Sequence, residues 1–222
     1  MSAVQTVRSL DLRGRTITTF IVYAVHRELT EMQEGERVEV VTDAFPAIDA
    51  DIRAWCRTTG NALVDIVVDD GHEEDLWRFV IEKGSPWRSG RKLAALISDD
   101  GLFELLAPLG FALAAGLEGH DVALYFQGPA VRVLATGHVA KMHGPGRPFS
   151  RFPRAGLAKA GHIPPQEKVG QLLDLGAKIF ACGSSMQHFR VDPSHLAFDG
   201  VIVAEYLTFM EQMGDADIHM TY

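Results

Sequence analysis

The pattern of hydrophobic and polar positions divides the chain near residue 90. Before it, apolar residues recur at helical spacing from Thr18 to Met32 and again from Ile48 to Thr59. Short runs rich in valine and isoleucine flank these helices and predict strands at Val4 to Leu10, Arg37 to Thr42, Ala62 to Asp69 and Leu76 to Ile81. An acidic turn, Asp69 to Asp75, joins the last two strands. The N-terminal part therefore predicts a two-layer unit in the order βαβαββ.

Beyond that point, nearly continuous apolar strands alternate with helices. Lys92 to Ser98 is apolar along most of its length, as expected for a parallel strand that is covered on both faces. Further strands are predicted at His120 to Phe126, Lys178 to Ala181, Val201 to Val203 and Asp217 to Tyr222, with helices at Gly101 to Leu117, Gln166 to Leu175 and Glu205 to Met213. This order predicts an α/β domain with a doubly wound, mostly parallel five-stranded sheet.

Two segments without a clear period mark the organisation of the chain. Gly84 to Arg91 is rich in glycine, serine and proline, so we expect domains at 1–84 and 92–222 joined by a linker at 85–91. Gly137 to Pro165 is rich in glycine, proline, histidine and arginine. A loop of this length inside an α/β domain is typically functional or disordered.

The charge distribution excludes some classes of function. The net charge is −8, and −7 of it falls in residues 1–84, which argues against a nucleic-acid-binding role for that domain. No apolar stretch is long and uninterrupted enough to cross a bilayer, and the first residues have no secretory pattern. We expect a cytoplasmic protein with no membrane partner.

The two cysteines, Cys56 and Cys182, lie in different predicted domains. A structural disulfide between them is not expected, and neither belongs to a Cys-x-x-Cys pair, so the sequence predicts no metal site and no iron–sulfur cluster. No organic cofactor is implied either. Cys56 lies on the apolar side of its helix beside Trp55, which favours packing in the core.

Cys182 follows the predicted strand Lys178 to Ala181, at the edge where open α/β sheets bind ligands. The residues after it allow a tight turn whose N–H groups would stabilise a thiolate; they are Gly183, Ser184 and Ser185. The other interpretation is a buried structural thiol, and the sequence leaves both open.

Ser98 and Asp99 end the first strand of the same predicted sheet. They fit a cap for the following helix, and they also lie at the edge where a ligand would bind. The residues Ser98, Asp99, Gly183, Ser184 and Ser185 are therefore predicted to surround the substrate of Cys182.

Residues 92–222 resemble the DsrE/DsrF family. The resemblance rests on Lys92-Leu-Ala-Ala-Leu-Ile-Ser-Asp99, Ala181-Cys-Gly-Ser-Ser-Met186 and Glu205-Tyr-Leu-Thr-Phe-Met-Glu-Gln-Met213. It implies that Cys182 is the sulfur-binding residue, because the cysteine of that family's strand–turn maps onto it. It also implies a homo-oligomer.

Residues 4–84 resemble the TusA (SirA-like) family through Met32-Gln-Glu-Gly-Glu36, Asp51-Ile-Arg-Ala-Trp-Cys56 and Trp77-Arg-Phe-Val-Ile-Glu-Lys-Gly84. That family transfers sulfur through a Cys-Pro motif at the start of the first helix. The corresponding window here, Arg15 to Phe20, has neither residue. A hydroxyl cannot form a persulfide, so this domain is expected to dock partners or regulate, with Thr18 or Thr19 capping the helix.

Two further features have open interpretations. From Ala123 to Gln166 there is no acidic residue, and the basic residues of this stretch would either place positive charge near Cys182 or form a solvated loop that makes intersubunit contacts. Phe149 and Phe152 favour packing of the loop on another surface. His188 fits a general base by spacing or a surface residue without a role.

The sequence thus gives two hypotheses of different classes. In the first, Cys182 accepts sulfane sulfur as a persulfide and passes it to a partner thiol, which makes the protein a sulfur carrier or sulfurtransferase with donor and acceptor proteins as partners. In the second, the protein is a non-catalytic adaptor of sulfur metabolism with a structural Cys182. A nucleotide-binding domain is disfavoured because no glycine-rich phosphate loop follows the first strand of the second domain.

Overall fold

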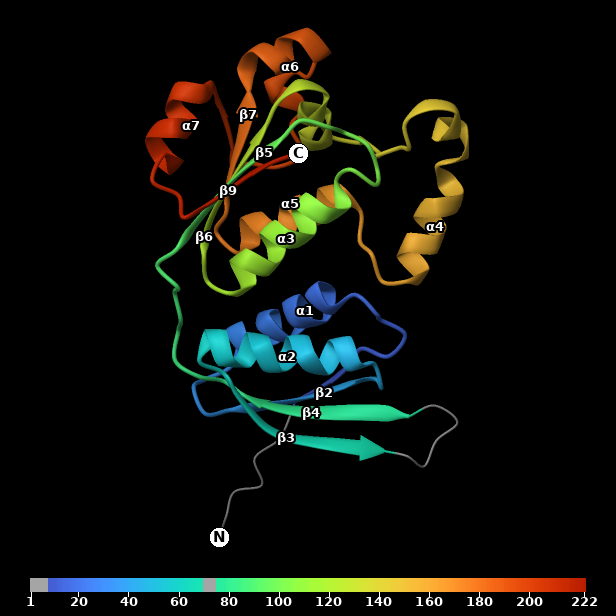
Figure 1. Cartoon of the computed structure of the whole chain (residues 1–222), viewed down its shortest axis with the longest axis vertical. Helices are drawn as coiled ribbons and strands as arrows, with labels where there is room; N and C mark the ends of the chain where they lie inside the picture. The colour runs from blue at the N-terminus through green and yellow to red at the C-terminus, as the bar shows by residue number, and fades with distance from the viewer. Residues whose placement is uncertain (1–7, 70–74) are drawn as a thin grey trace. The chain divides into compact units, whose positions relative to one another are not determined.

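A computed structural model describes residues 8–69 and 75–222 of the chain, and its contacts divide it into two units. The first unit comprises the described residues up to Arg88 together with Lys159–His162, and the second comprises Ser89–Ala158 and Ile163–Tyr222. Figure 1 traces both units along the chain. The predicted acidic turn lies mostly outside the described residues, as does the beginning of the predicted first strand.

The first unit is a mixed sheet with two helices. Its elements are β1 (Arg8–Asp11), α1 (Thr18–Thr30), β2 (Arg37–Asp43), α2 (Pro46–Thr59), β3 (Ala62–Asp69) and β4 (Leu76–Glu82). In the described part of the unit the strand order is β1-β2-β4-β3; β1 and β2 are parallel and the other pairs are antiparallel. The predicted βαβαββ order is confirmed.

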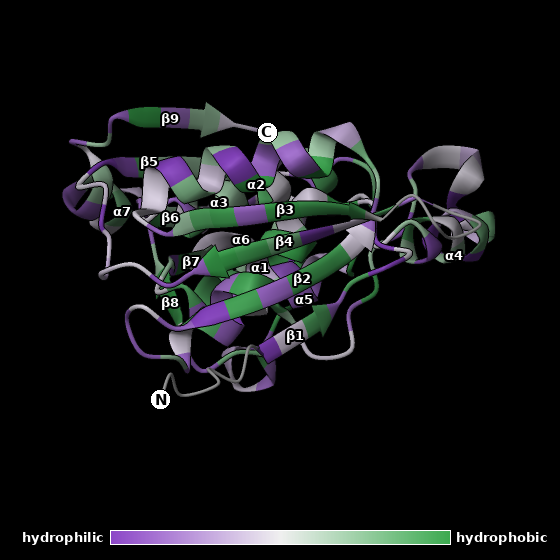
Figure 2. Ribbon diagram, turned by 90° about the horizontal axis from the view of Figure 1, so that it is seen from below, coloured by the Kyte–Doolittle hydropathy of each residue, from purple (hydrophilic) through white to green (hydrophobic). Residues whose placement is uncertain are grey.

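Helical spacing of apolar residues explains why α1 and α2 pack on this sheet. Ile48, Ile52 and Trp55 are buried on α2, and Ile21 and Val25 are fully buried on α1. Figure 2 looks onto the opposite face of the sheet, where hydrophilic and hydrophobic residues alternate along β2. That alternation is the pattern of a strand with one face toward a core and the other toward solvent.

The second unit is a parallel sheet flanked by helices. Its strands are β5 (Lys92–Ile97), β6 (Asp121–Phe126), β7 (Lys178–Cys182), β8 (Val201–Ala204) and β9 (Ile218–Thr221). Its helices are α3 (Leu106–Leu117), α4 (Arg151–Lys159), α5 (Pro165–Asp174), α6 (Gly183–Phe189) and α7 (Tyr206–Met213). All neighbouring strands are parallel in the order β8-β7-β6-β5-β9, so the predicted α/β class with a mostly parallel sheet is confirmed.

Apolar side chains fill both sides of this sheet. Phe209 of α7 packs against Tyr125 and Phe180, with ring centroids 5.2 Å and 5.4 Å apart. Helices α3 and α5 lie side by side, and the side chains of Leu109 and Leu172 on them are fully buried. Burial on both faces explains why these strands read as apolar runs in the sequence.

The helix after β5 begins later than the sequence predicts. Gly101 forms a bridge with Lys141, and the N–H of Leu102 donates to the carbonyl of Lys141, so this segment forms a turn and α3 begins at Leu106. The predicted cap by Ser98 or Asp99 is therefore wrong, because α3 has Leu105 at its N-cap and no side-chain cap. The backbone groups of Gly101 and Leu102 thus pair with the long loop at Lys141 instead of starting the helix.

The long segment Gly137–Pro165 contains ordered structure. It includes the 3₁₀ helix η2 (Gly144–Phe149) and helix α4, and the buried Ser150 hydroxyl joins η2 to Met142. Phe149 and Phe152 are each 60% exposed in this single chain, so their packing on another surface stays a prediction. The remaining described segments include η1 (Gly128–Leu134) and η3 (Pro193–His195).

Candidate functional site

Cys182 ends β7 and occupies the N-cap of α6. Strand β7 lies between β6 and β8 in the sheet, so the residues that follow these strands meet at the same edge as Cys182. The Cys182 side chain is only 4% exposed. The sulfur is thus held where the sheet ends, almost covered by its neighbours.

The serines after Cys182 surround its sulfur with donors. The Ser185 hydroxyl lies 3.0 Å from Sγ, the Ser185 N–H lies 3.4 Å away, and the Ser184 hydroxyl lies 3.2 Å away. A second contact orients Ser185, because its hydroxyl oxygen accepts the N–H of Gly128 at 2.9 Å. The turn after β7 therefore provides hydrogen bonds to a sulfur anion from both side chain and backbone.

These donors decide the acidity of the thiol. Burial raises the pKa of Cys182, but hydrogen bonds from the hydroxyls of Ser184, Ser185 and Tyr125 and from the Ser185 backbone outweigh it and hold the pKa below its ordinary value. A lowered pKa increases the fraction of thiolate, which is the nucleophilic form. The hydroxyls, and not the cations of the long loop, carry this effect.

Two further residues contact the Cys182 sulfur and lie outside the set of site residues that the sequence predicts. The carboxylate of Glu205 lies 3.5 Å from Sγ through Oε2, and its Oε1 accepts the N–H of Ser184 at 2.8 Å. Tyr125 reaches the sulfur from β6, and burial followed by the contact with Cys182 raises the pKa of its phenol. The available signal for Glu205 was its position directly after a strand, the same signal that identified Cys182.

The other predicted site residues lie at this edge but make different contacts. Ser98 accepts a hydrogen bond from the amide of Gln127 at 2.8 Å, and the Tyr206 hydroxyl donates to the same amide group. Gly183 follows Cys182 directly, and its Cα lies beside the Glu205 carboxylate, since an added Cβ would be 3.3 Å from Oε1. Ser98 thus connects to α7 through Gln127 rather than to the sulfur.

Asp99 holds the long loop at the end of β5. Its carboxylate contacts Nε2 of His143 at 2.5 Å, and Arg132 pairs with the neighbouring Asp100 at 3.2 Å. The contact with Asp99 raises the pKa of His143. Within residues 8–69 and 75–222, Asp99, Asp100 and His143 form the group whose ligand atoms are close enough to hold a metal ion, within 4.8 Å of one another. The ion pairs explain the arrangement without a metal.

His188 and Cys56 have no place in this site. His188 is exposed near the end of α6 and packs edge-on against Phe189, and none of the hydrogen bonds found among the described residues joins it to Cys182. Cys56 is 5% exposed in the core of the first unit, and burial raises the pKa of its thiol to about 11. Cys56 is therefore an unreactive core residue at neutral pH, in agreement with the sequence prediction.

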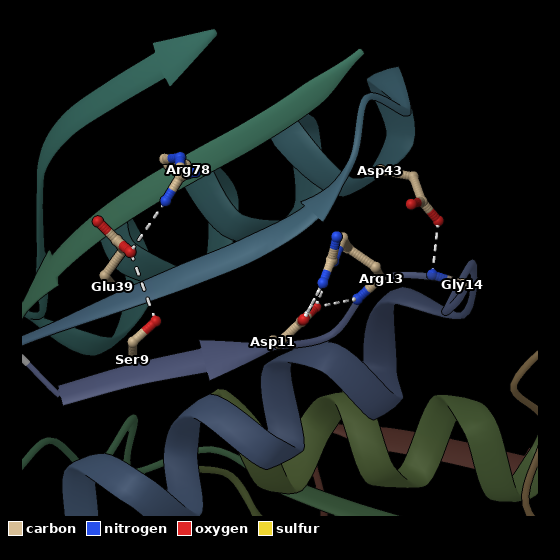
Figure 3. A network of polar contacts seen from close by, with 7 residues as sticks. All are labelled: Ser9, Asp11, Arg13, Gly14, Glu39, Asp43 and Arg78. Atoms are coloured by element: carbon tan, nitrogen blue, oxygen red, sulfur yellow. Dashed lines mark hydrogen bonds and ion pairs between the residues drawn. The ribbon is translucent and has the colours of Figure 1, made fainter. Parts of the chain in front are cut away.

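The start of α1, where a sulfur-transferring cysteine would stand, carries no sulfur. The helix begins at Thr18 with Ile17 as its N-cap and no side-chain cap, so the predicted cap by Thr18 or Thr19 is wrong. Figure 3 shows the polar contacts before this helix: Arg13 pairs with Asp11, and the N–H of Gly14 donates to Asp43 at 2.7 Å. These contacts position the turn without a nucleophile.

Comparisons with known proteins cover both units. Residues 92–222 match the DsrE/DsrF-like family, and residues 22–83 match the model of sulfurtransferase TusA, so that match begins after the window that lacks cysteine and proline. The predicted fusion of these two kinds of domain is confirmed. No curated protein matches the chain.

Two solved structures are similar over part of the chain. The ychN protein from E. coli has 15% identity and a TM-score of 0.41, covering 60% of this chain and 99% of that one. A formyltetrahydrofolate deformylase from Pseudomonas putida KT2440 has 11% identity and a TM-score of 0.18, covering 65% of this chain and 58% of that one. With TM-scores below 0.5, neither similarity carries an argument about function. Among the described residues, none of the helices has the length and apolar character needed to cross a bilayer.

Proposed function

Since this chain belongs to the DsrE/DsrF-like family, we propose that it is a sulfur carrier that accepts sulfane sulfur as a persulfide on Cys182 and relays it to a partner thiol. The matches to the TusA and DsrE/DsrF-like families support a sulfur-relay role. The observation that carries the finer proposal is the ring of donors from Ser184, Ser185 and Tyr125 around the Cys182 sulfur. They favour the thiolate that the transfer needs.

The proposed reaction is an exchange between two sulfur atoms. The Cys182 thiolate attacks the terminal sulfur of a donor persulfide, the donor's S–S bond breaks, and the donor leaves as a thiolate with the electron pair. A partner thiolate then attacks the outer sulfur of the Cys182 persulfide, the S–S bond to Sγ breaks, and Cys182 leaves as a thiolate. No oxidant is consumed, and no cofactor is proposed.

Ser184, Ser185 and Gly183 are proposed to line the substrate position, because they form the turn around the sulfur. Ser98 and Asp99 are proposed to border it from the end of β5, as residues at the same edge of the sheet. The partners are then sulfur-donor and sulfur-acceptor proteins. A reducing, cytoplasmic location suits the role, and both cysteines are free thiols here.

The first unit, proposed as a separate domain of residues 1–84 joined through 85–91, would dock partners rather than carry sulfur. The window Arg15 to Phe20 has no cysteine, and Cys56 is buried with a raised pKa. We also propose a homo-oligomer formed through the second unit, because exposed apolar side chains gather on β8 and α7, among them Ile202, Tyr206 and Leu207.

The first experiment measures intact mass after incubation with a persulfide donor. The wild type should gain about 32 Da per sulfur, the Cys56→Ala variant should gain the same, and Cys182→Ala should gain nothing. A folded, reduced protein without an adduct on Cys182 would contradict the carrier function.

A non-catalytic adaptor is the second candidate. It is favoured by the low exposure of Cys182, 4%, which limits access by a large donor. The rate of thiol labelling at neutral pH separates the two functions. A carrier requires fast alkylation of Cys182, whereas a structural thiol should react at a rate close to that of the buried Cys56.

A further inference from the structure

Glu205 is held against the nucleophile by contacts on both carboxylate oxygens. Oε1 accepts the backbone N–H of Ser184 at 2.8 Å, and Oε2 lies 3.3 Å from the Ser184 hydroxyl and 3.5 Å from Sγ of Cys182. The residue itself directly follows β8 and precedes α7, so its backbone is anchored at the sheet edge. The carboxylate cannot turn away from the sulfur without losing these hydrogen bonds.

The Glu205 carboxylate is a charged group in contact with the Cys182 sulfur. The hydrogen bond from the Ser184 backbone, with those from Cys182 and Ser184, lowers the pKa of Glu205, so it is ionised at neutral pH. The other side chains on the sulfur, Ser184, Ser185 and Tyr125, are uncharged. In the described part of the chain, none of the hydrogen bonds to Sγ comes from lysine or arginine.

Two basic side chains of the second unit are held by partners other than Glu205. Arg132 lies over the ring of Phe189 and is paired with Asp100, and His143 is paired with Asp99. Each of these basic side chains is thus engaged by an acidic partner other than Glu205. A donor that approaches Cys182 therefore meets a net negative group at the point of attack.

The length of an S–S bond places any sulfur bonded to Cys182 close to the Glu205 carboxylate. An S–S bond is about 2.05 Å long, and Sγ lies 3.5 Å from Oε2, so a sulfur bonded to Sγ lies at most about 5.6 Å from the carboxylate oxygen. At such a separation, like charges repel even in a water-like dielectric, and an S–H group can come within reach of the carboxylate. Glu205 therefore repels or hydrogen-bonds the group that is attached to the transferred sulfur.

We infer that Glu205 is a specificity-determining residue that makes Cys182 discriminate against anionic sulfur donors such as thiosulfate, in favour of a hydropersulfide, R–S–SH. This inference rests on the proposed carrier function. The protonated hydropersulfide is uncharged, and its terminal S–H donates to the Glu205 carboxylate as the Cys182 thiolate approaches. Thiosulfate has two negative charges and no proton to donate at neutral pH.

Both reactions balance without a further reactant. With a hydropersulfide, the Cys182 thiolate bonds to the terminal sulfur, the S–S bond of the donor breaks, and R–S⁻ leaves while the proton stays on the terminal sulfur beside Glu205. With thiosulfate, the same attack releases sulfite with the electron pair and leaves a persulfide anion next to the carboxylate. Thiosulfate thus brings two negative charges up to the Glu205 carboxylate as it approaches, and the protonated hydropersulfide brings none.

The test compares two alkylating agents of nearly equal size, neutral iodoacetamide and anionic iodoacetate. Both react with the same thiolate, so the ratio of their rates on Cys182 does not depend on the thiolate fraction. We expect Glu205→Gln to lower the ratio of the iodoacetamide rate to the iodoacetate rate about three- to tenfold. Glu205→Asp keeps the charge and should retain most of the selectivity.

Glu211→Gln is the matched control, because Glu211 is an exposed carboxylate on α7 without a hydrogen bond to Cys182 among the described contacts. Its ratio should equal that of the wild type. Added salt should move the wild-type ratio toward that of Glu205→Gln. Equal ratios in wild type and Glu205→Gln would overturn the inference, whether or not Cys182 accepts sulfur.

A second arm uses sulfur donors, thiosulfate and glutathione hydropersulfide, with loading of Cys182 followed by intact mass. The wild type should load from the hydropersulfide and several-fold more slowly from thiosulfate, and Glu205→Gln should narrow this difference. Equal loading of the wild type from both donors would overturn the inference. Loading from neither donor, with charge selectivity intact in the alkylation arm, would instead contradict the carrier function.

Discussion

Burial raises the pKa of both cysteine thiols, but at Cys182 it is outweighed by hydrogen bonds from hydroxyls and a backbone N–H, and at Cys56 it is opposed only by the charge of Arg57. The first thiol has donors from Ser184 and Ser185 and a lowered pKa, whereas the second lies in an apolar core with a pKa of about 11. Both cysteines are almost inaccessible, at 4% and 5% exposure. Burial therefore does not distinguish them, and the atoms that touch each sulfur do.

Replacing Ser185 by alanine should make Cys182 less reactive. The change removes the hydroxyl at 3.0 Å from Sγ, so the pKa of the thiol rises and its alkylation by iodoacetamide at neutral pH slows about several-fold. The pH profile of the rate should shift to higher pH and reach a plateau there. Ser194→Ala, which removes a hydroxyl bound to Asp192, should leave the profile unchanged.

Cys56 should make the first unit less stable at alkaline pH. Its pKa is higher in the folded state than its ordinary value of 9.0, so the stability is present below pH 9 and is lost as pH rises toward 11. The loss from this thiol amounts to about 2 to 3 kcal/mol. Urea unfolding followed by tryptophan fluorescence should show a steeper alkaline loss in the wild type than in Cys56→Ala. Parallel curves for the two proteins would refute this.

At the scale of elements, regular periods were predictable and irregular segments were not. Helices α1 and α2 follow from apolar spacing, and β5 follows from its apolar run. Helix α6 was missed because its opening, Gly183-Ser184-Ser185, has weak helix formers, which the cap at Cys182 and the contact with Glu205 compensate. The order within the segment Gly137–Pro165 depends on contacts with distant residues, which no local pattern reveals.

The candidate site was also predictable only in part, where a single strand end determines it. Cys182 and the two serines came from a strand–turn pattern, because one strand end suffices to locate them. Glu205 and Tyr125 come from two other strands, and their approach to Cys182 depends on the strand order β8-β7-β6. A single sequence gives the strands but leaves that order undetermined.

Gly84 at the end of the first unit should not tolerate a side chain. A Cβ at this position would lie 1.9 Å from the carbonyl oxygen of Gly60, a backbone atom that cannot yield without moving the chain. We expect Gly84→Ala to destabilise the first unit by about 1 to 3 kcal/mol, seen as a lower urea midpoint in tryptophan fluorescence. Gly156→Ala, where the added Cβ meets nothing within 4 Å, should keep the wild-type midpoint.

The contact between His143 and Asp99 should hold the long loop in a pH-dependent way. The pKa of His143 is raised by Asp99, so the charged contact is present below the ordinary pKa of histidine and is lost as pH rises through the raised value. At pH 6, trypsin should cut the loop of His143→Ala faster than that of the wild type. The difference should shrink at pH 8, and an equal difference at both values would contradict the assignment.

At the scale of the whole molecule, an acidic unit with no cysteine at its first helix is joined to a unit that contains Cys182, the proposed sulfur acceptor. Residues 1–84 account for −7 of the net charge of −8. The second unit combines the Cys182 site with exposed apolar residues that begin next to it, since Tyr206 follows Glu205. One unit is suited to electrostatic recognition, and the other to chemistry and apolar association.

The proposed homo-oligomer should depend on that apolar surface. Leu207 is 87% exposed on α7, and Met210 on the same helix is 57% exposed. We expect Leu207→Asp to reduce the mass measured by light scattering to that of a monomer, because a charge at an apolar contact opposes burial. Phe149→Asp alters an exposed apolar residue of the long loop, which is 60% exposed, and should preserve the assembly. A wild type that is monomeric would contradict the proposal directly.

The position of Cys182 as the N-cap of α6 has a consequence for repeated use of the protein. Its Sγ holds the first turn of a helix, while the sulfur that would be transferred is the additional atom beyond it. Loading and unloading then add and remove only the outermost atom, while Sγ itself stays bonded to the protein at the start of the helix. The atom that caps the helix and the atom that would be transferred are both sulfur but are different atoms. The empty and loaded proteins can therefore share one backbone conformation.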